Sequence, residues 1–486
     1  MTIGLSLRIL MVKNTSKAVL FFILVISLIP QILVQTGCAN IMPPLGGLRD
    51  TIPPILLKAS PADSSKNFKD SRITLTFDEF IQLDNPRTNL VLSPVPKREP
   101  EVTSSLRTVT VKLKDTLQPN TTYTINFGNA IKDVNEGNIN KNFTYIFSTG
   151  PYFDSLTLTG KVILAETGKP DSTLTVMLHQ HGEDSAVFNE NPRFLTHLDS
   201  AGNFRFRNLP YGKFYIYALE DMGSHRYTSG KQKFAFADSP VVLHLVNEPV
   251  TLYAFAEESQ VTGTSRSGVP QLGAKPKISS NTEKRLRIQT NLSAGQLDLL
   301  SGLELSFEQP LKNLDTSLIH FSTDSSFTPV KNYQLIEDTS KKKLTIQHEW
   351  KENTLYHVII EKNFAQDTLG RGLLKTDTLA FTTKKRSDYG SLTLRFRNFD
   401  PSINPVLLFV NNNAVAKSFP LTSPQLNLPL FPPGEYELRI LHDRNKNGKW
   451  DTGEFFGKRI QPEIVKPLTR KINVKPDWEN DFDIAL

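Results

Sequence analysis

Cysteine is almost absent from this sequence: Cys38 is the only one among 486 residues. One thiol cannot form an intramolecular disulfide, so a small scaffold held by disulfides is excluded. The sequence also contains no G-x-S-x-G, H-E-x-x-H or phosphate-binding glycine motif. These motifs mark many hydrolases, zinc proteases and nucleotide-binding enzymes. We therefore predict that the protein is not an enzyme.

Concentrated charge is absent as well. The net charge is +7, and three cations, Arg8, Lys13 and Lys17, lie near the N-terminus, which leaves +4 for the remainder. Nucleic-acid-binding surfaces need a dense basic patch, so no nucleic-acid partner is predicted. Tryptophan is scarce, with three copies, whereas phenylalanine has 30. A chain of this length and composition can fill several separate cores.

The first 37 residues have the pattern of a secretory signal peptide. The three cations, with no acid, precede the apolar run A-V-L-F-F-I-L-V-I-S-L-I-P-Q-I-L-V at residues 18–34. Proline and glutamine interrupt this run, and it is barely long enough to span a bilayer, whereas a signal peptide tolerates both features. We predict that residues 1–37 are a signal peptide.

The signal segment ends in Q-T-G-C-A-N, in which small residues precede Cys38. This stretch resembles the lipobox of bacterial lipoproteins, although Gln35 replaces the usual aliphatic residue. The resemblance implies a lipid anchor at Cys38, the membrane as a partner, and a location in the bacterial cell envelope. The protein would be an outer-membrane lipoprotein, periplasmic or surface-exposed; an incidental thiol is the alternative. The Pro/Gly-rich residues 38–55 are expected to form a tether.

Short alternating segments dominate the rest of the chain. Examples are R-I-T-L-T-F (72–77), T-V-T-V-K-L (108–113) and F-T-Y-I-F-S-T (143–149), separated by stretches rich in Asn, Asp, Gly and Pro. Period-two patterning at this spacing is typical of a β-sandwich. The sequence also contains two internal repeats: 71–149 aligns with 301–383, and 209–231 with 431–454. The order is therefore A-B-A′-B′.

The A units resemble the bacterial Ig-like domains of the S-layer-associated type. In the first copy the resemblance rests on I-T-L-T-F-D-E, on the L-x-P-x-T-x-Y turn ending at Tyr123, and on the closing strand. Tyr356 lies in register with Tyr123, and both look like tyrosine corners, whose hydroxyl caps nearby backbone. The B units resemble the transthyretin-like or carboxypeptidase-regulatory-like sandwich, on residues 199–221. Together these features resemble a family of uncharacterised envelope lipoproteins.

The predicted fold is all-β, with tandem β-sandwich domains, Ig-like and transthyretin-like, in the order A-B-A′-B′. The expected intervals are a signal peptide (1–37), a tether (38–55), an Ig-like domain (56–150), a transthyretin-like domain (151–258), a flexible linker (259–284), a divergent Ig-like domain (285–385) and a second transthyretin-like domain (386–486).

The last B unit contains the stretch D-R-N-K-N-G-K-W-D-T-G-E, which has the spacing of a calcium-binding loop. Positions 1, 3, 5, 7, 9 and 12 of such a loop are occupied by Asp443, Asn445, Asn447, Lys449, Asp451 and Glu454. A strand precedes the loop, so the helices of an EF-hand are missing. We predict a weak, structural calcium site; a plain hairpin turn is the alternative. The first-half counterpart keeps Asp221 but has Lys231 where Glu454 would be, and no metal is predicted there.

Two other groups of side chains are interpreted as structural. His179 and His181 alternate along an expected strand, so both rings would face one side, and a polar strand face is favoured over a transition-metal site. Asp78 and Glu308 recur at the same place in the two A units. Separate domains do not easily bring carboxylates within the roughly 5–9.5 Å that glycoside hydrolysis needs.

The leading functional hypothesis is a non-catalytic binding, adhesion or scaffold module of the envelope, whose partner is another envelope protein or a glycan. The alternative is a carbohydrate-binding accessory lipoprotein of a surface uptake system, which would need exposed aromatic side chains for sugar rings. The three tryptophans, Trp350, Trp450 and Trp478, give that alternative little support. An envelope hydrolase is the least favoured of the three.

Overall fold

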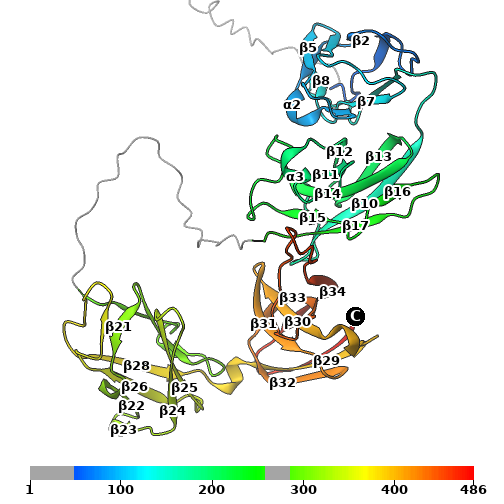
Figure 1. Cartoon of the computed structure of the whole chain (residues 1–486). Coiled ribbons are helices and arrows are strands. Elements are labelled where there is room, and N and C mark those ends of the chain that lie inside the picture. The colour runs from blue at the N-terminus through cyan, green and yellow to red at the C-terminus, as the bar shows by residue number, and fades with distance from the viewer. Residues whose placement is uncertain (1–48, 258–284) are drawn as a thin grey trace, which may run out of the picture.

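The computed structural model describes residues 49–257 and 285–486 (Figure 1). The predicted signal peptide, Cys38, the first part of the tether and the linker lie outside the described residues. Within the described ranges, helix is limited to segments of three or four residues, and none is long and apolar enough to cross a membrane. The prediction of an all-β chain of tandem sandwiches is confirmed.

The first domain packs a four-stranded sheet, β1-β2-β6-β5, against the three-stranded sheet β4-β7-β9, with the pair β3-β8 beside them. Alternation explains the core, because Ile73, Leu75 and Phe77 point inward from β2 while the threonines between them are partly exposed. The elements are β1 (Leu56–Ser60), β2 (Arg72–Phe77), β3 (Ile81–Leu83), α2 (Pro86–Asn89), β4 (Val91–Ser93), β5 (Glu101–Ser105), β6 (Thr108–Lys112), β7 (Thr122–Asn126), β8 (Ile131–Asp133) and β9 (Thr144–Ser148).

The third domain repeats this plan. Its sheets are β18-β20-β25-β24 and β19-β28-β26-β22-β23, with the pair β21-β27 in the place of β3-β8. The elements are β18 (Ile288–Thr290), β19 (Gln296–Leu297), β20 (Leu303–Phe307), β21 (Leu311–Leu314), η1 (Thr316–Leu318), β22 (Ile319–Thr323), β23 (Thr328–Pro329), β24 (Tyr333–Glu337), β25 (Lys343–His348), β26 (Leu355–Ile360), β27 (Ala365–Asp367) and β28 (Asp377–Thr383).

Both predicted tyrosine corners form. The Tyr123 hydroxyl accepts a hydrogen bond from the Gln118 backbone N–H at 2.8 Å, and the Tyr356 hydroxyl accepts one from the Lys351 N–H at 3.3 Å. In each case the donor lies five residues upstream, as in Ig-type sandwiches. The repeat found in the sequence is therefore a repeat of hydrogen bonds as well as of strands.

The second and fourth domains share a different plan. Each has a three-stranded sheet with one parallel pair, β13-β10-β17 and β32-β29-β35, facing a sheet built around β11-β14 or β30-β33. The elements are β10 (Leu156–Leu164), β11 (Leu174–His179), α3 (Ala186–Asn189), β12 (Phe194–His197), β13 (Asn203–Leu209), β14 (Gly212–Glu220), β15 (Phe234–Phe236), β16 (Val241–Leu243), β17 (Val250–Ala254), η2 (Arg386–Asp388), β29 (Gly390–Arg397), η3 (Pro401–Ile403), β30 (Pro405–Asn411), β31 (Ala414–Pro420), β32 (Gln425–Phe431), β33 (Gly434–His442), β34 (Ile464–Val474) and β35 (Glu479–Ala485).

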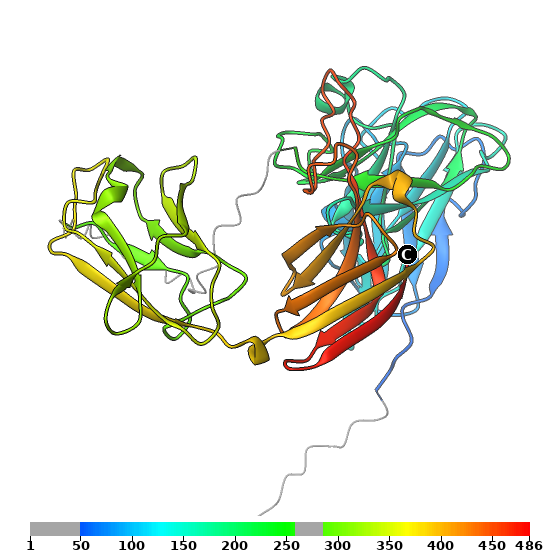
Figure 2. The same ribbon diagram turned by 90° about the horizontal axis from the view of Figure 1, so that it is seen from below.

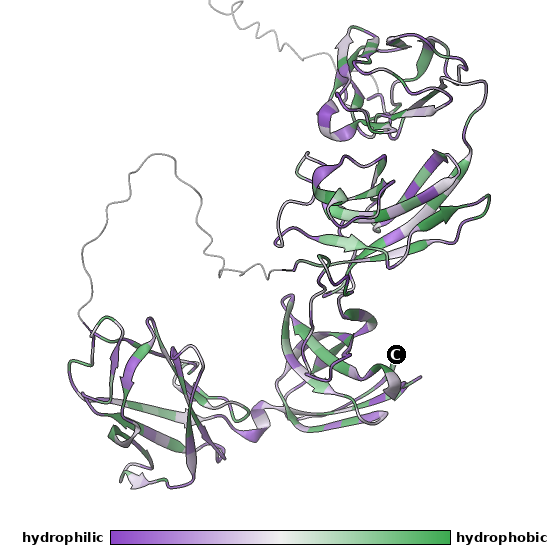
Figure 3. Cartoon of the chain, viewed as in Figure 1, coloured by the Kyte–Doolittle hydropathy of each residue, from purple (hydrophilic) through white to green (hydrophobic). Residues whose placement is uncertain are grey.

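The domains are not arranged in chain order. The first, second and fourth domains form a stack, and the third lies to one side (Figures 1 and 2). Hydrophobic residues concentrate on the strands of each sandwich (Figure 3), and each domain has its own apolar cluster. The fourth domain thus contacts the second although the whole third domain separates them in the sequence.

The predicted tether needs a correction at its C-terminal end. The Asn138 side chain donates to the backbone carbonyls of Asp50 (3.1 Å) and Ile52 (3.3 Å), and the Asn140 side chain donates to that of Pro54 (2.8 Å). Residues 50–55 therefore run along the first domain as part of it. Composition alone missed this, because the Pro-rich segment is fixed by side-chain amides that lie more than 80 residues away in the sequence.

Candidate functional site

The long connection between β33 and β34, residues 443–463, contains the predicted calcium positions, and we call it the docking loop. Asp443 opens it and is buried. Its carboxylate accepts hydrogen bonds from the backbone N–H groups of Lys446 (2.7 Å), Asn447 (3.2 Å) and Gly448 (2.7 Å). Gly448 has a φ of 74°, a left-handed conformation that glycine adopts without strain. One carboxylate thereby shapes the first turn of the loop.

Three further predicted side chains meet in the loop. The Nδ2 atoms of Asn445 and Asn447 both donate to Oδ2 of Asp451, at 2.6 and 2.7 Å. The Asn447 Oδ1 atom accepts from the backbone N–H of Lys449 at 2.7 Å, while the Lys449 side chain is exposed. The structure thus brings the side chains of positions 3, 5 and 9 together, with the two amide nitrogens on the Asp451 carboxylate.

Glu454 is placed differently from the other predicted positions. Its carboxylate accepts from Lys458 at 2.8 Å, on the outer part of the loop. A buried glutamate that the motif did not include, Glu463, closes the loop instead: it accepts from the N–H groups of Arg444 (2.7 Å) and Asp451 (3.1 Å). Within residues 49–257 and 285–486, no three His, Cys, Asp or Glu side chains are grouped so as to hold a metal ion.

The tip of the docking loop inserts two aromatic rings into the second domain. Phe455 has no exposed surface, and its ring centroid lies 5.8 Å from Tyr217, 4.9 Å from Phe234 and 5.0 Å from Phe236. Phe456 packs beside it on Phe188, at 4.5 Å. Burying a phenylalanine side chain fully contributes about 1.5–3 kcal/mol, so this contact is a substantial part of the interface.

Polar contacts surround the inserted rings. The Arg459 guanidinium donates to Asp184 at 2.8 Å through Nε, and Thr452 Oγ1 donates to the Ala256 carbonyl at 2.7 Å. The Phe455 N–H donates to the Glu257 carboxylate at 2.8 Å. At the loop base, the Val465 N–H donates to the Ala165 carbonyl at 2.8 Å. An apolar centre with a hydrogen-bonded rim is the usual anatomy of a specific protein interface.

The corresponding loop of the second domain has the same opening. Asp221 accepts hydrogen bonds from the N–H groups of Gly223 and His225, at 2.9 Å each, and its carboxylate also pairs with the His225 ring. Further along, Tyr227 is buried in the aromatic cluster that receives Phe455. The two homologous loops therefore build the two sides of one contact.

The two histidines singled out in the sequence do not share a strand face, which corrects the prediction. β11 ends at His179, whose ring is buried against the edge of Tyr217 with centroids 5.5 Å apart. Burial lowers the pKa of His179 to about 4, and among the described residues its Nδ1 atom has no hydrogen-bond partner. His181 is exposed and pairs with Glu190 at 2.8 Å, which raises the pKa of His181. The burial of His179 was not visible in the alternating pattern.

The carboxylates at the strand ends of the A units have structural partners. Asp78 accepts from the Ile55 N–H at 2.7 Å, and Glu308 pairs with Arg371 at 3.4 Å. Asp78 thus fixes the incoming chain of the first domain, and Glu308 joins two turns of the third. These positions contribute to the scaffold, as their recurrence indicated.

Comparison with known protein families identifies one domain of the chain, and the result agrees with its fold. Residues 50–149 match the family model of the bacterial Ig-like domain, Big_5. No curated protein matches the chain. The first domain is therefore identified as a bacterial Ig-like domain, and the chain is a multidomain β-sandwich protein that contains one.

Several solved structures have weak similarity to the chain. Escherichia coli alpha-2-macroglobulin (domains MG0-NIE-MG1) is 16% identical over 38% of this chain and 72% of its own, with a TM-score of 0.20. BcpA, the major pilin subunit of Bacillus cereus, is 10% identical over 68% and 99%, with a TM-score of 0.17. The S-layer protein rSbsC(31-844) is 11% identical over 90% and 54%, with a TM-score of 0.15. Similarities at this level carry no functional inference.

Proposed function

We propose that the protein is a non-catalytic, lipid-anchored protein of the bacterial cell envelope that acts as a scaffold or adhesion module. The bacterial Ig-like match over residues 50–149 supports a surface or envelope role, and the lipobox-like stretch at Cys38 supports the anchor. The observation that carries the scaffold role is the complete burial of Phe455 in the second domain. It joins domains distant in sequence into one stack, which would hold a partner at a fixed distance from the membrane.

We also propose that calcium binds the docking loop and stiffens it. The side chains of Asn445, Asn447 and Asp451 already lie together, and turning the two amides would present their oxygens, the ligands that hard cations prefer. Asp443 and the Lys449 carbonyl complete the predicted set, and Glu454 would exchange Lys458 for the ion. With two amides among its ligands the site carries little negative charge, so millimolar affinity is expected.

Thermal melting of the full chain without its signal peptide tests the calcium proposal. Millimolar calcium should raise the melting temperature, and Asp451→Asn should abolish that rise, because it removes one ligand charge while keeping the side chain's shape. Asp338→Asn in the third domain is the matched control, since Asp338 also caps its own turn, by accepting from the Lys343 N–H at 2.8 Å. An equal calcium response in the wild type and Asp451→Asn would leave the loop a plain hairpin.

Metabolic labelling tests the anchor. The full chain, expressed in a Gram-negative bacterium with a fatty-acid analogue, should incorporate the label and fractionate with the outer membrane. Cys38→Ser should incorporate none and appear in the soluble fraction. Label-free, soluble wild-type protein would overturn the anchored function.

A further inference from the structure

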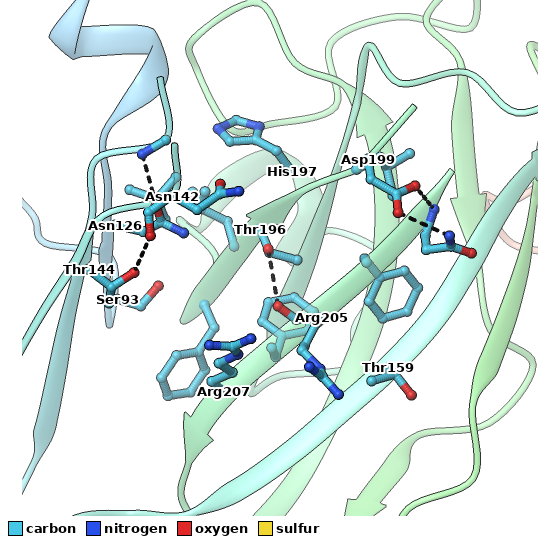
Figure 4. Close-up of a pocket in the computed structure, with 18 of the residues that line it drawn as sticks. Ser93, Asn126, Asn142, Thr144, Thr159, Thr196, His197, Asp199, Arg205 and Arg207 are labelled. Atoms are coloured by element: carbon cyan, nitrogen blue, oxygen red, sulfur yellow. Dashed lines mark hydrogen bonds between the residues drawn. The ribbon is translucent and has the colours of Figure 1, made fainter. Parts of the chain in front are cut away.

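A cleft of about 1340 Å³ lies between the first and second domains. One wall is the outer face of β4, β7 and β9, with Ser93, Asn126 and Thr144; the other is formed by β12, β13 and β10 (Figure 4). In Figure 4 the Arg207 side chain lies on the side of Ser93, and the Arg205 side chain lies nearer Thr159 of β10. The cleft is separate from the docking loop, and its volume is large enough for an extended ligand.

Positive charge dominates the lining. Four cations contribute to it: Lys141 from the first domain and Lys161, Arg205 and Arg207 from the second. Among the residues that the structure describes, none of the four has an ion pair with a carboxylate. The carboxylate in the lining, Asp199, is engaged by its own turn, where it accepts from the N–H groups of Ala201 (2.9 Å) and Asn203 (2.8 Å). Lys161 also interacts electrostatically with Asp199, so the excess positive charge that the cleft offers to an anion is carried mainly by Lys141, Arg205 and Arg207.

The two arginines are held in a defined arrangement. They alternate along β13 with Phe204 and Phe206, which are buried in the domain core. Residues two apart on a strand face the same side, about 6.5–7 Å from each other, so both guanidinium groups project from one rigid face. A guanidinium binds carboxylate, sulfate or phosphate oxygens through paired, charge-assisted hydrogen bonds.

Apart from Lys141, the opposite wall carries no charge and is rich in hydroxyl and amide groups. Its hydroxyl and amide side chains are those of Thr88, Asn89, Ser93, Thr124, Asn126, Asn129, Asn142 and Thr144. Such groups both donate and accept hydrogen bonds and suit a ligand covered with hydroxyls. The phenylalanines that line the cleft, Phe194, Phe204 and Phe206, are buried at 3–4% exposure, so they offer no surface on which a nucleobase or a flat sugar face could stack.

We propose that the cleft between the first and second domains binds an acidic polysaccharide, with Arg205 and Arg207 on its anionic groups and the Ser/Thr/Asn wall on its hydroxyls. The site would give the proposed scaffold a ligand. A negative result in the binding test below would leave the proposed scaffold function unaffected.

Binding of the full chain to four probes tests the proposal: a polyuronate, a sulfated glycan, neutral dextran and single-stranded DNA. At 50 mM NaCl the polyuronate or the sulfated glycan should bind and dextran should not, and 300 mM NaCl should weaken binding at least tenfold, because the contacts are ionic. Which acidic glycan binds more tightly identifies the anionic group. No binding to either, or tighter binding to the DNA, would overturn the proposal.

Charge-neutral variants locate the binding. Arg205→Gln with Arg207→Gln should reduce affinity at least tenfold, and Lys141→Gln on the opposite wall should reduce it several-fold. The control is Arg395→Gln with Arg397→Gln, which removes two exposed arginines that alternate in the same way on β29 of the fourth domain, where Arg395 pairs with Asp481. Equal losses in the cleft and control variants would show a non-specific charge effect and contradict the assignment.

Discussion

At the scale of single residues, Phe455 is the side chain on which the account depends most. It belongs to the fourth domain, yet its ring completes an aromatic cluster of the second, with Tyr217, Phe234 and Phe236. Edge-to-face and tilted ring pairs of this kind add about 0.5–1.5 kcal/mol beyond simple burial. Removing the ring would leave a cavity at the centre of the interface.

We expect Phe455→Ala to weaken the docking of the two domains by about 3–5 kcal/mol, the range measured when buried aromatic rings are truncated. Trp450 lies in the same loop and packs against the cluster, so its fluorescence during urea unfolding reports the loss. Phe80→Ala is the control, because Phe80 is 47% exposed on the first domain; it should cost less than about 1 kcal/mol. Equal losses of stability in Phe455→Ala and Phe80→Ala would mean that the Phe455 ring does not contribute the docking energy.

His179 predicts a dependence on pH. Its pKa is about 4 in the folded chain because of burial, against an ordinary value of 6.5. Between these values the unfolded chain binds a proton that the folded chain does not, so stability falls as the pH drops from 6.5 to 4, by up to about 3 kcal/mol. Above pH 6.5 the histidine makes no pH-dependent contribution.

Urea unfolding of the second domain at pH 4.5 and 7 checks this. His179→Phe, which keeps a ring against Tyr217, should reduce the pH dependence and leave the part due to His197, whose pKa is also lowered by burial. His181→Gln, at an exposed position, should retain the full dependence. A variant at position 179 with the wild-type slope would mean that the buried histidine is not the group that titrates.

At the scale of elements, the packing of the docking loop against the second domain depends on Gly453. A Cβ atom on Gly453 would lie 2.7 Å from both the Ile460 carbonyl oxygen and the Phe255 ring, which is closer than such atoms approach. Phe255 belongs to the second domain and Ile460 to the loop itself. The glycine therefore allows the loop both to fold back on itself and to pack against the second domain at this position.

Gly453→Val should therefore open the contact between the second and fourth domains while both stay folded. Small-angle scattering should show a larger radius of gyration, with unchanged β-sheet circular dichroism. Gly372→Val is the control, because its nearest neighbour, the Ala365 carbonyl oxygen, lies at an ordinary 3.6 Å. An unchanged radius of gyration for Gly453→Val would contradict the tight packing of the docking loop against the second domain.

Strands and turns could be predicted from the sequence because their signals are local. The segment R-I-T-L-T-F coincides with β2, and a few adjacent residues determine the turn before each tyrosine corner. Glu463 was missed because it lies nine residues beyond the calcium motif and reaches the loop only through the fold. The partner of Phe455 was also missed, since two adjacent phenylalanines indicate burial without indicating which domain buries them.

At the scale of the whole molecule, the chain folds back on itself. After the third domain it returns to the second, and the junction between the third and fourth domains is fixed by the Tyr389 hydroxyl, which accepts from the Leu299 N–H at 2.8 Å. The cleft between the first and second domains could not be foreseen from the sequence either, because its two walls come from separate sandwiches. The order of domains in space, and not in sequence, defines both the docking interface and the cleft.

The measurement that tests the account most directly is the distance between the second and fourth domains in solution. Spin labels at Glu248→Cys and Ala416→Cys, both exposed positions, in a Cys38→Ser background would be read by pulsed electron paramagnetic resonance. The docked arrangement predicts one narrow distance distribution that broadens in Phe455→Ala. A broad distribution in the protein with Phe455 intact would contradict it, because the second and fourth domains would then move independently of each other.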